Sequence, residues 1–460
     1  MRVRQLSISL LVILSLVLSA CAQATQAPAQ VEPTQAPVQA EPTEAAAPAN
    51  TDAVQITFWH AMSGSREEVI KGIADRFNAS QTEYQVMPEY TGSYAETLTK
   101  ALAAYRSGTP PTVVQVYEVG TRTMLDSQAI VPVHTLNKGE VDWNDVVQPI
   151  MKYYSADGNL YCMPFNSSTA MLYYNKDMFE AAGLDPEKPP QTWAEVEQYS
   201  KQIMEKTEAS GGFSMGWPAW ILEQMYGTHN VLLADQDNGR SGLATETYWN
   251  NEFGVKVLTE WQRMAKDKVL VYGGREYAAN DPFLAGQFPF LFQSTSSLGG
   301  ILKSAEFKVG TAFLPRFEVD YEQGNSVVGG GCLWLMNKAT PEQQAGAWEF
   351  FKFINSVDET IEWHKGTGYF PATNTAYEKL KEEGWFTDEP NHATAFDQIL
   401  GGADTPASRG VLLGNFVQIR DIVGAAIEDV VVNNVDPKAA LDKATEESNQ
   451  VLKDYEELNK

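Results

Sequence analysis

Residues 164–175 read Pro-Phe-Asn-Ser-Ser-Thr-Ala-Met-Leu-Tyr-Tyr-Asn, and the two halves of this stretch differ in polarity. The second half, 170–175, has the apolar and aromatic character of a buried strand. Four small polar side chains precede it, from Asn166 to Thr169. Burying a hydroxyl or an amide without a hydrogen-bond partner costs about 1–3 kcal/mol. The stretch therefore predicts a buried strand whose polar entrance has a specific role, in the fold or in a binding site.

Strands and helices alternate on both sides of this stretch, which predicts a mostly parallel sheet with helices on both faces. Three helices are expected to begin at capping boxes, in which Ser or Thr is followed three residues later by Glu or Gln. The boxes are Ser65 with Glu68, Thr192 with Glu195, and Thr340 with Gln343. The other expected elements are strands at 54–58, 84–90, 112–118, 170–175, 287–293 and 307–313, an apolar stretch at 327–336, and helices at 94–106, 341–354 and 437–458.

The alternating pattern restarts after residues 164–175, which indicates two α/β lobes. The chain has 460 residues, of which 43% are apolar and 11% aromatic, and this is enough for two well-packed domains. Ligands of open sheets bind outside the carboxyl ends of the strands, and pockets favour domain interfaces. The sequence thus favours a ligand cleft between the lobes.

The first twenty residues are predicted to be a signal peptide. Arg2 and Arg4 precede an apolar run over 6–18, which is too short to span a bilayer as a helix and has the layout of a secretory signal. The run ends in Leu-Ser-Ala-Cys at 18–21, which resembles a bacterial lipobox. We therefore expect Cys21 to be acylated; the alternative is an ordinary cleavage site beside a chance cysteine.

Residues 21–52 are rich in Pro, Ala, Gln and Thr and are predicted to form a disordered tether. No later run is long and apolar enough to span a membrane. The mature protein is accordingly expected to be extracytoplasmic and anchored to the cell membrane by lipid.

The formal charge of −25 argues against nucleic acid or an anionic membrane surface as a partner. The same charge raises the question of how an anionic ligand would be held. Beyond Cys21 the chain has only Cys162 and Cys332, for which a disulfide and two buried thiols are both open, the thiols being favoured from the sequence.

No catalytic motif is found: GxSxG, HExxH, the P-loop, GxGxxG and CxxC are all missing, and the five histidines show no metal-ligand spacing. The stretch 235–242 is expected to be a solvated loop rather than a calcium loop, and 155–161 a hairpin turn. We expect no catalytic residue, metal or cofactor. The residues alone point to an exported binding protein.

Several motifs carry a resemblance to a known family. They include ITFWHAMSG at 56–64, QVYEVGT at 115–121, GTGYFP at 366–371 and GNFVQIR at 414–420. Over about residues 53–458 the chain resembles the glycerol-3-phosphate-binding proteins of Ugp-type ABC importers, which belong to the extracellular solute-binding family 1 and the maltose-binding-like superfamily.

The resemblance implies a two-lobed α/β periplasmic-binding-protein fold of type II, with the cleft between lobes joined by hinge crossovers. Lobe 1 would comprise 53–163 plus 330–375, and lobe 2 would comprise 165–326 plus 378–460. The implied function is that of a monomeric substrate-binding lipoprotein, not an enzyme, that delivers sn-glycerol 3-phosphate to permease subunits with a cytoplasmic ATPase. A glycerophosphodiester such as glycerophosphocholine, or a sugar, is the alternative ligand.

The resemblance also implies a set of ligand-binding residues. Hydroxyls, a backbone N–H and one guanidinium as the single full charge would hold the phosphate, a carboxylate would accept from the glycerol hydroxyls, and two indoles would flank the glycerol. The residues are, in that order, Tyr94, Ser168, Ser294, Tyr369, Gly330, Arg420, Glu118, Trp217 and Trp220.

Two points of this assignment stay open. Thr295 or Ser296 could replace Ser294, because the surrounding sequence departs from the family pattern. A phosphodiesterase with Glu118 as its base is the enzymatic alternative, which the chain disfavours because it lacks a metal cluster or a nucleophile–base pair. In the opening stretch, Ser168 is assigned to the phosphate, and its three polar neighbours are expected to satisfy backbone groups at the bend.

Overall fold

The computed structural model describes residues 52–317 and 321–459. The predicted signal peptide, the lipidation site at Cys21 and the predicted tether before Asp52 lie outside the described residues. Two sheets, one short hairpin and the helices around them make up the described part of the chain.

The first sheet has the strand order β2-β1-β3-β12-β4, and β7 pairs with the other end of β12. Its strands are β1 (Val54–His60), β2 (Tyr84–Tyr90), β3 (Val113–Tyr117), β4 (Ile130–Val131), β7 (Met163–Ser168) and β12 (Gly329–Met336). β1 runs parallel to β2 and β3, whereas β12 runs antiparallel to β3, β4 and β7. The expectation of a mostly parallel sheet is therefore wrong: β12 re-enters this sheet at the end where β7 leaves it, so its direction is reversed.

The second sheet has the order β11-β8-β10-β9. Its strands are β8 (Ala170–Asn175), β9 (Phe213–Met215), β10 (Phe290–Ser294) and β11 (Val309–Ala312). β8 is antiparallel to β10 and β11, while β9 is parallel to β10. The predicted strand at 170–175 is confirmed, and all six of its residues are buried. A separate hairpin, β5 (Ser155–Ala156) and β6 (Asn159–Leu160), is also confirmed at the predicted turn.

The opening stretch of the sequence passes from one sheet to the other, because β7 ends at Ser168 and β8 begins at Ala170. Its polar residues differ from expectation. Asn166 accepts from Gln115 and donates to the Tyr94 hydroxyl, at 2.8 and 2.7 Å, so both of its side-chain bonds are to other side chains. The hydroxyls of Ser167 and Thr169 have no partner.

The backbone explains this difference. The Ser167 carbonyl accepts from the N–H of Phe370 at 3.2 Å, and the Thr169 carbonyl accepts from the N–H of Thr295 at 3.0 Å. Neighbouring backbone thus already satisfies the groups that the side chains were expected to serve, and the prediction for these three residues is wrong.

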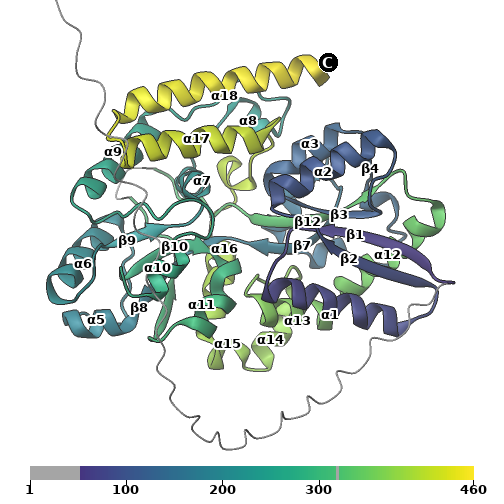
Figure 1. The fold of residues 1–460 in the computed structure, drawn as a ribbon, viewed down its shortest axis with the longest axis horizontal. Coiled ribbons are helices and arrows are strands. Elements are labelled where there is room, and N and C mark those ends of the chain that lie inside the picture. Colours follow the sequence, from purple (N-terminus) through teal and green to yellow (C-terminus); the bar gives the residue numbers. More distant parts are fainter. Residues whose placement is uncertain (1–51, 318–320, 460) are drawn as a thin grey trace, which may run out of the picture. The chain divides into compact units, whose positions relative to one another are not determined.

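The helices cover both faces of the first sheet, with α2 and α3 on one side of β1–β3 and α1 on the other (Figure 1). The main helices are α1 (Ser65–Ser80), α2 (Tyr94–Ser107), α3 (Thr121–Asp126), α4 (Gln148–Tyr153), α5 (Lys176–Ala182), α6 (Trp193–Lys206), α7 (Pro218–Thr228), α8 (Asp235–Gly239), α9 (Glu252–Lys266), α10 (Asn280–Leu284), α11 (Leu298–Ser304), α12 (Pro341–Ile354), α13 (Val357–Thr367), α14 (Asn374–Glu382), α15 (Trp385–Asp388), α16 (Thr394–Gly401), α17 (Phe416–Val431) and α18 (Pro437–Asn459).

Two of the three predicted capping boxes form, at the starts of α6 and α12. The third does not: Ser65 lies inside α1, and the N-cap position is Gly64, whose φ of 62° suits a glycine. A box that was not predicted, Ser93 with Glu96, begins α2. This last box matters for the site, because it fixes Tyr94 as the first residue of α2.

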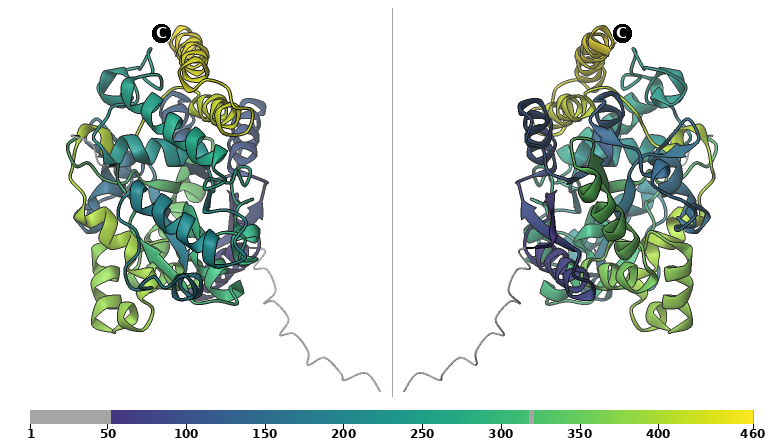
Figure 2. Two further views of the ribbon diagram at one scale, coloured as in Figure 1. Left: turned by 90° about the vertical axis from the view of Figure 1, so that its left-hand side faces the viewer. Right: turned by 90° about the vertical axis from the view of Figure 1, so that its right-hand side faces the viewer.

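The C-terminal helix α18 packs on the outside of α17, as the two side views show (Figure 2). It is amphipathic as predicted, with buried residues that include Leu441, Val451 and Leu452. Among the described residues no helix has the length and apolarity needed to cross a membrane. The stretch 235–242 contains the short element α8, in which Gln236, Asp237 and Asn238 have positive φ, and the Asp235 carboxylate accepts from backbone N–H groups at 245 and 246.

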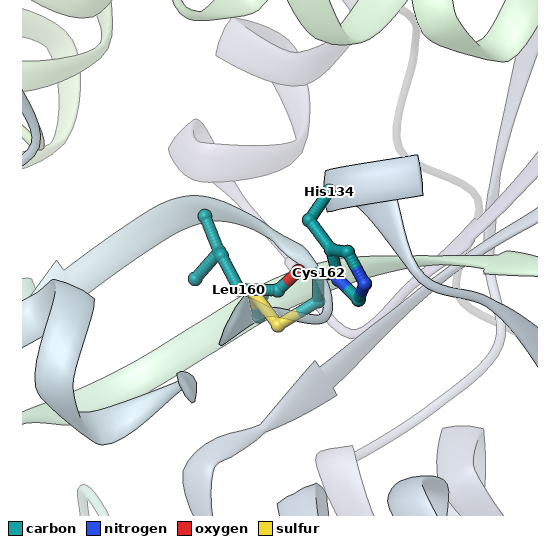
Figure 3. Close-up of a disulfide and its surroundings, with 4 residues drawn as sticks. His134, Leu160 and Cys162 are labelled. Atoms are coloured by element: carbon teal, nitrogen blue, oxygen red, sulfur yellow. Dashed lines mark hydrogen bonds between the residues drawn. A yellow bond between two sulfur atoms is a disulfide. The ribbon is translucent and has the colours of Figure 1, made fainter. Parts of the chain in front are cut away.

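Cys162 and Cys332 form a disulfide (Figure 3). Their Cα atoms lie 5.8 Å apart across the β7–β12 pair, and both residues are fully buried. The sequence-based preference for two free thiols is therefore wrong, because the antiparallel register places Cys332 opposite Pro164, close to Cys162. Beside the bridge, His134 Nδ1 lies 2.9 Å from the Leu160 carbonyl oxygen. The bridge ties together the two strands that carry Ser168 and Gly330.

Candidate ligand-binding site

A cavity opens between the strand ends of the two sheets, with about 340 Å³ of empty space when the part open to solvent is included. All nine residues of the predicted ligand-binding set line it. Three further residues complete its wall: Tyr117, Tyr277 and Ser296. Ser296 was an open alternative to Ser294, and both face the cavity, whereas the third candidate, Thr295, has a buried hydroxyl without a partner.

The residues reach the cavity from the ends of strands. Ser168 and Ser294 are the last residues of β7 and β10, and Glu118 directly follows β3. This is the edge at which open α/β sheets bind ligands. Tyr94 comes from the first turn of α2 and Arg420 from α17.

Gly330 is a glycine for steric reasons. Its φ is 91°, and a Cβ at this position would lie 1.8 Å from the Asn166 carbonyl oxygen. Any side chain here would force β7 and β12 apart. The close approach of these strands therefore depends on Gly330, and it leaves backbone rather than side chain at this part of the cavity wall.

Five hydroxyl-bearing residues form what we term the hydroxyl cluster: Tyr94, Tyr277, Ser294, Ser296 and Tyr369. Three of the oxygens accept hydrogen bonds from nitrogen donors. Asn166 Nδ2 donates to Tyr94 at 2.7 Å, Arg66 Nη1 to Tyr277 at 3.0 Å, and the Ser296 N–H to Ser294 at 3.2 Å.

These nitrogens donate only, so the three oxygens act as acceptors and keep their own hydrogens for another partner. Tyr94 also lies 3.2 Å from Tyr369, and Tyr277 lies 3.2 Å from Ser296. Burial raises the pKa of Tyr94 and of Tyr277, which keeps both phenols protonated. The cluster therefore presents O–H donors to the cavity.

A buried ion-pair triad forms a second part of the wall. Arg420 donates from Nε and Nη2 to Glu223 at 2.8 and 2.6 Å, and from Nη1 to Glu118 at 2.6 Å. The side chains of Arg420, Glu118 and Glu223 are only 10%, 6% and 2% exposed. We call these three residues the Arg420 triad.

The triad determines the electrostatic surroundings of Arg420. Burial opposes its charge, yet the two carboxylates raise the pKa of Arg420 above its ordinary value, while burial raises the pKa of Glu223. Two carboxylates already bind Arg420, so its charge is compensated within the protein, and its predicted contact with the phosphate stays a prediction. The sequence carried one signal for Glu223: it is a single carboxylate within the apolar helix α7, and a buried charge needs a partner.

The two predicted indoles belong to α7. Trp217 has a left-handed backbone at the N-cap, with φ 54°, and its ring lies edge-on to Tyr277 at 5.6 Å. Trp220 packs against Gly329, where a Cβ would lie 2.4 Å from its ring, and its indole nitrogen has no partner. Trp217 thus has a backbone conformation that is uncommon for a residue with a side chain, and the position of the Trp220 ring requires a glycine at 329.

The Tyr369 backbone is held by His364. The Trp385 indole N–H donates to His364 Nε2 at 3.3 Å, which leaves the Nδ1 hydrogen to bond the Tyr369 carbonyl at 2.7 Å. Burial lowers the pKa of His364 to about 3, so the ring is neutral near pH 7. Neutral His364 thus fixes Tyr369 from behind the cavity.

A second cavity, with about 690 Å³ of empty space when the part open to solvent is included, adjoins the first and shares part of its wall. The shared residues are Tyr94, Tyr117, Trp217, Trp220 and Arg420. Among its additional residues are Tyr272, Arg275, Glu276 and Asp421, so its wall is aromatic and carries charges of both signs, with Arg275 3.6 Å from Asp421. Within residues 52–317 and 321–459, no group of three His, Cys, Asp or Glu residues is placed to hold a metal ion.

Two helix-covered β-sheets with a cavity at the ends of their strands, lined by hydrogen-bonding side chains and rings, have the architecture of a solute-binding protein. The chain belongs to the bacterial extracellular solute-binding proteins, whose family model matches residues 72–394. It is 37% identical over 423 residues to the sn-glycerol-3-phosphate-binding periplasmic protein UgpB of Shigella flexneri serotype 5b, a match covering 89% of this chain and 95% of the relative. The UgpB of Escherichia coli K12 is 36% identical over the same shares. The resemblance stated from the motifs is confirmed.

Solved structures confirm the predicted fold class, the two-lobed periplasmic-binding-protein fold. UgpB of Mycobacterium tuberculosis in complex with glycerophosphocholine matches with a TM-score of 0.75 and 22% identity, over 87% of this chain and 99% of that one. The maltose-maltodextrin binding protein of Alicyclobacillus acidocaldarius matches with a TM-score of 0.69 and 17% identity, over 86% and 100%.

Proposed function

We propose that this protein is the extracytoplasmic substrate-binding lipoprotein of an ABC importer, and that it binds sn-glycerol 3-phosphate. The observation that carries the proposal is the hydroxyl cluster, in which three of the five oxygens accept from nitrogen donors and so keep their own hydrogens for another partner. A group that only accepts hydrogen bonds is the natural occupant of such a wall. A phosphate is such a group, and buried phosphates need their oxygens saturated with donors.

The ligand is proposed to lie with its phosphate on the hydroxyl cluster, Ser168 and the backbone at Gly330, and with its glycerol toward Glu118 and Arg420. The Arg420 triad carries two carboxylates and one guanidinium, hence one net negative charge. It would repel a phosphate and accept or donate to alcohols, which favours one orientation of the ligand. Neutral donors for the phosphate also explain how a chain with a net charge of −25 holds an anion.

The second candidate ligand is a glycerophosphodiester such as glycerophosphocholine. The adjoining cavity favours it, because its wall combines rings of Tyr94, Trp217 and Tyr272 with the carboxylate of Glu276, while Asp421 is paired with Arg275. Aromatic faces and carboxylates bind quaternary ammonium groups. A diester with a choline group would fill both cavities, whereas the monoester would fill the first.

The cellular placement is also a proposal. Cleavage before Cys21 and its acylation would anchor the protein through residues 21–52 to the outer side of the cytoplasmic membrane or to another extracytoplasmic membrane. The protein is proposed to act as a monomer, with lobes at 53–163 plus 330–375 and 165–326 plus 378–460, and to deliver its ligand to permease subunits coupled to a cytoplasmic ATPase. Relatives named as periplasmic binding proteins support this placement.

Titration calorimetry of the mature chain with sn-glycerol 3-phosphate, glycerophosphocholine and maltose tests the proposal. We expect saturable one-site binding of the phosphate esters and none of maltose. Tyr94→Phe should weaken binding about tenfold, since it removes a donor from a charged acceptor, while the exposed Arg106→Gln should leave affinity unchanged. Binding of maltose alone would refute the proposal, and release of choline from glycerophosphocholine would identify an enzyme instead.

A further inference from the structure

Arg66 is a second guanidinium close to the cavity, and neither the predicted set nor the cavity wall includes it. It is the second residue of α1, which packs on the first sheet, whereas its partner Tyr277 lies between α9 and α10 beside the second sheet. Arg66 Nη1 donates to the Tyr277 oxygen at 3.0 Å, and the guanidinium carbon lies 4.9 Å from the centre of the Tyr277 ring.

The charge of Arg66 is not cancelled in the way that of Arg420 is. No carboxylate of residues 52–317 or 321–459 forms a salt bridge with Arg66; its hydrogen-bond partner is the phenol of Tyr277, and the phenols of Tyr369 and Tyr94 are also near it. All three phenols belong to the hydroxyl cluster. Arg66 is therefore the cation that stands directly behind the donors proposed to face the phosphate.

Tyr277 links Arg66 to the cavity through a chain of hydrogen bonds, and the direction of these bonds matters. Its oxygen accepts from Arg66, so its O–H hydrogen points to Ser296 Oγ, at 3.2 Å, or to a ligand. A phenol that accepts from a cation is a stronger donor, since hydrogen bonds in a chain polarise one another. Trp217, packed edge-on against the Tyr277 ring, holds the ring in place from the other side.

We propose that Arg66 is a positioning residue that acts through Tyr277 and gives the site its preference for a doubly charged phosphate monoester over a singly charged diester. The inference rests on the proposed function, since it names which phosphate ester that site selects. A monoester carries a charge of about −1.5 to −2 near pH 7. A diester has one ionisable oxygen fewer and gains less from a nearby cation.

The test compares two ligands, sn-glycerol 3-phosphate and glycerophosphocholine, on each of five mature proteins: wild type, Arg66→Gln, Arg66→Lys, Tyr277→Phe, and the double variant Arg66→Gln/Tyr277→Phe. We expect Arg66→Gln to weaken monoester binding about tenfold and diester binding by no more than about threefold. Arg66→Lys should recover most of the preference, because it keeps a donor and a charge. The double variant should bind the monoester no more weakly than the weaker single variant, because both residues act in one chain of bonds.

The outcomes separate this inference from the proposed function. If the wild type binds neither ester, the proposed function fails. If the wild type binds the monoester and Arg66→Gln retains its affinity, or loses the same factor for both ligands, the inference is overturned while the proposed function stands.

Arg106→Gln on α2 removes the same charge from an exposed position and is expected to change neither affinity. Circular dichroism establishes that each variant is folded. Should Arg66→Gln not fold, Tyr277→Phe decides: unchanged selectivity in that variant overturns the inference.

Discussion

Two arginines lie near one cavity, and they differ in whether carboxylates compensate their positive charge. Arg420 lines the wall, is 10% exposed and is bound by two carboxylates. Arg66 stands behind the wall, and its partner is a neutral phenol. A cation that touches the cavity is thus already neutralised, while the one that does not touch it keeps its charge. The contrast is between an arginine whose charge two carboxylates compensate and an arginine whose hydrogen-bond partner is a phenol.

The largest expected effect is that of Arg420 on the free energy of unfolding, in which it should differ from Arg66. Arg420→Ala should lower the free energy of unfolding by about 3–5 kcal/mol, because Glu118 and Glu223 would remain buried without their partner. Urea unfolding of the mature chain measures this. The variant Arg420→Met combined with Glu118→Gln and Glu223→Gln removes the stranded charges and should recover much of the loss. A loss below about 1 kcal/mol for Arg420→Ala would show that the triad is not a coupled unit.

The second prediction concerns the loss of stability at low pH through His364, which holds Tyr369 of the hydroxyl cluster. His364 has a folded-state pKa of about 3 against an ordinary 6.5, so the unfolded chain binds the proton first as pH falls. Its contribution to stability is complete above pH 6.5 and declines below it, by about 2 kcal/mol at pH 5. Buried His60, His229 and His392 have pKa values lowered to about 4 and add to the decline.

Urea unfolding at pH 7.5 and pH 5.0 tests this sign. The wild type should be less stable at pH 5.0, and His364→Asn should lose about 2 kcal/mol less over the same interval. An equal loss in both proteins would mean that His364 is not the acid-sensitive support of Tyr369.

The third prediction concerns the effect of the negative charge of Glu223 on ligand affinity. Glu223→Gln should raise the affinity for sn-glycerol 3-phosphate about threefold, because it removes one negative charge near the cavity and keeps an acceptor for Arg420. Calorimetry measures the change, with the exposed Glu205→Gln on α6 as the matched control. A weaker affinity in Glu223→Gln would indicate instead that Glu223 holds Arg420 in a geometry that glutamine does not reproduce.

The smallest expected effect completes the comparison. Arg66→Gln should change the free energy of unfolding by no more than about 1 kcal/mol, the usual value of one cation–π contact at a partly exposed site. Thermal unfolding without ligand checks this value. A loss as large as that of Arg420→Ala would remove the contrast between a structural arginine and one reserved for the ligand.

Local signals predicted much of the fold. Thr192 with Glu195 and Thr340 with Gln343 begin helices as expected, because a capping box depends on a few neighbouring residues. The direction of β12 was not predictable in this way, since it depends on where the chain re-enters a sheet after more than one hundred and fifty residues, a distance comparable to the 170 residues between Cys162 and Cys332. The same long separation hid the disulfide.

In the candidate site, too, residues within motifs were predictable and long-range pairs were not. The nine predicted residues among the cavity's twelve lining residues came from motifs shared with a family, not from composition or periodicity. Glu223 lies 197 residues from Arg420 in the sequence, and Arg66 lies 211 residues from Tyr277. Neither pair is visible in a motif, because each bond depends on how distant segments meet. Only the lone carboxylate within the apolar helix α7 was a usable signal, and it predicts a partner without naming it.

The Cys162–Cys332 bridge has a practical consequence for any work on this protein. The bridge joins β7 to β12, and these strands place Ser168 and Gly330 at the cavity. Chain expressed in a reducing cytoplasm would be purified without the bond, whereas exported chain would carry it. Thiol reductants in a binding buffer would therefore change the measured affinity if they break the bond. Each affinity measurement should be accompanied by a thiol titration that gives the state of the two cysteines.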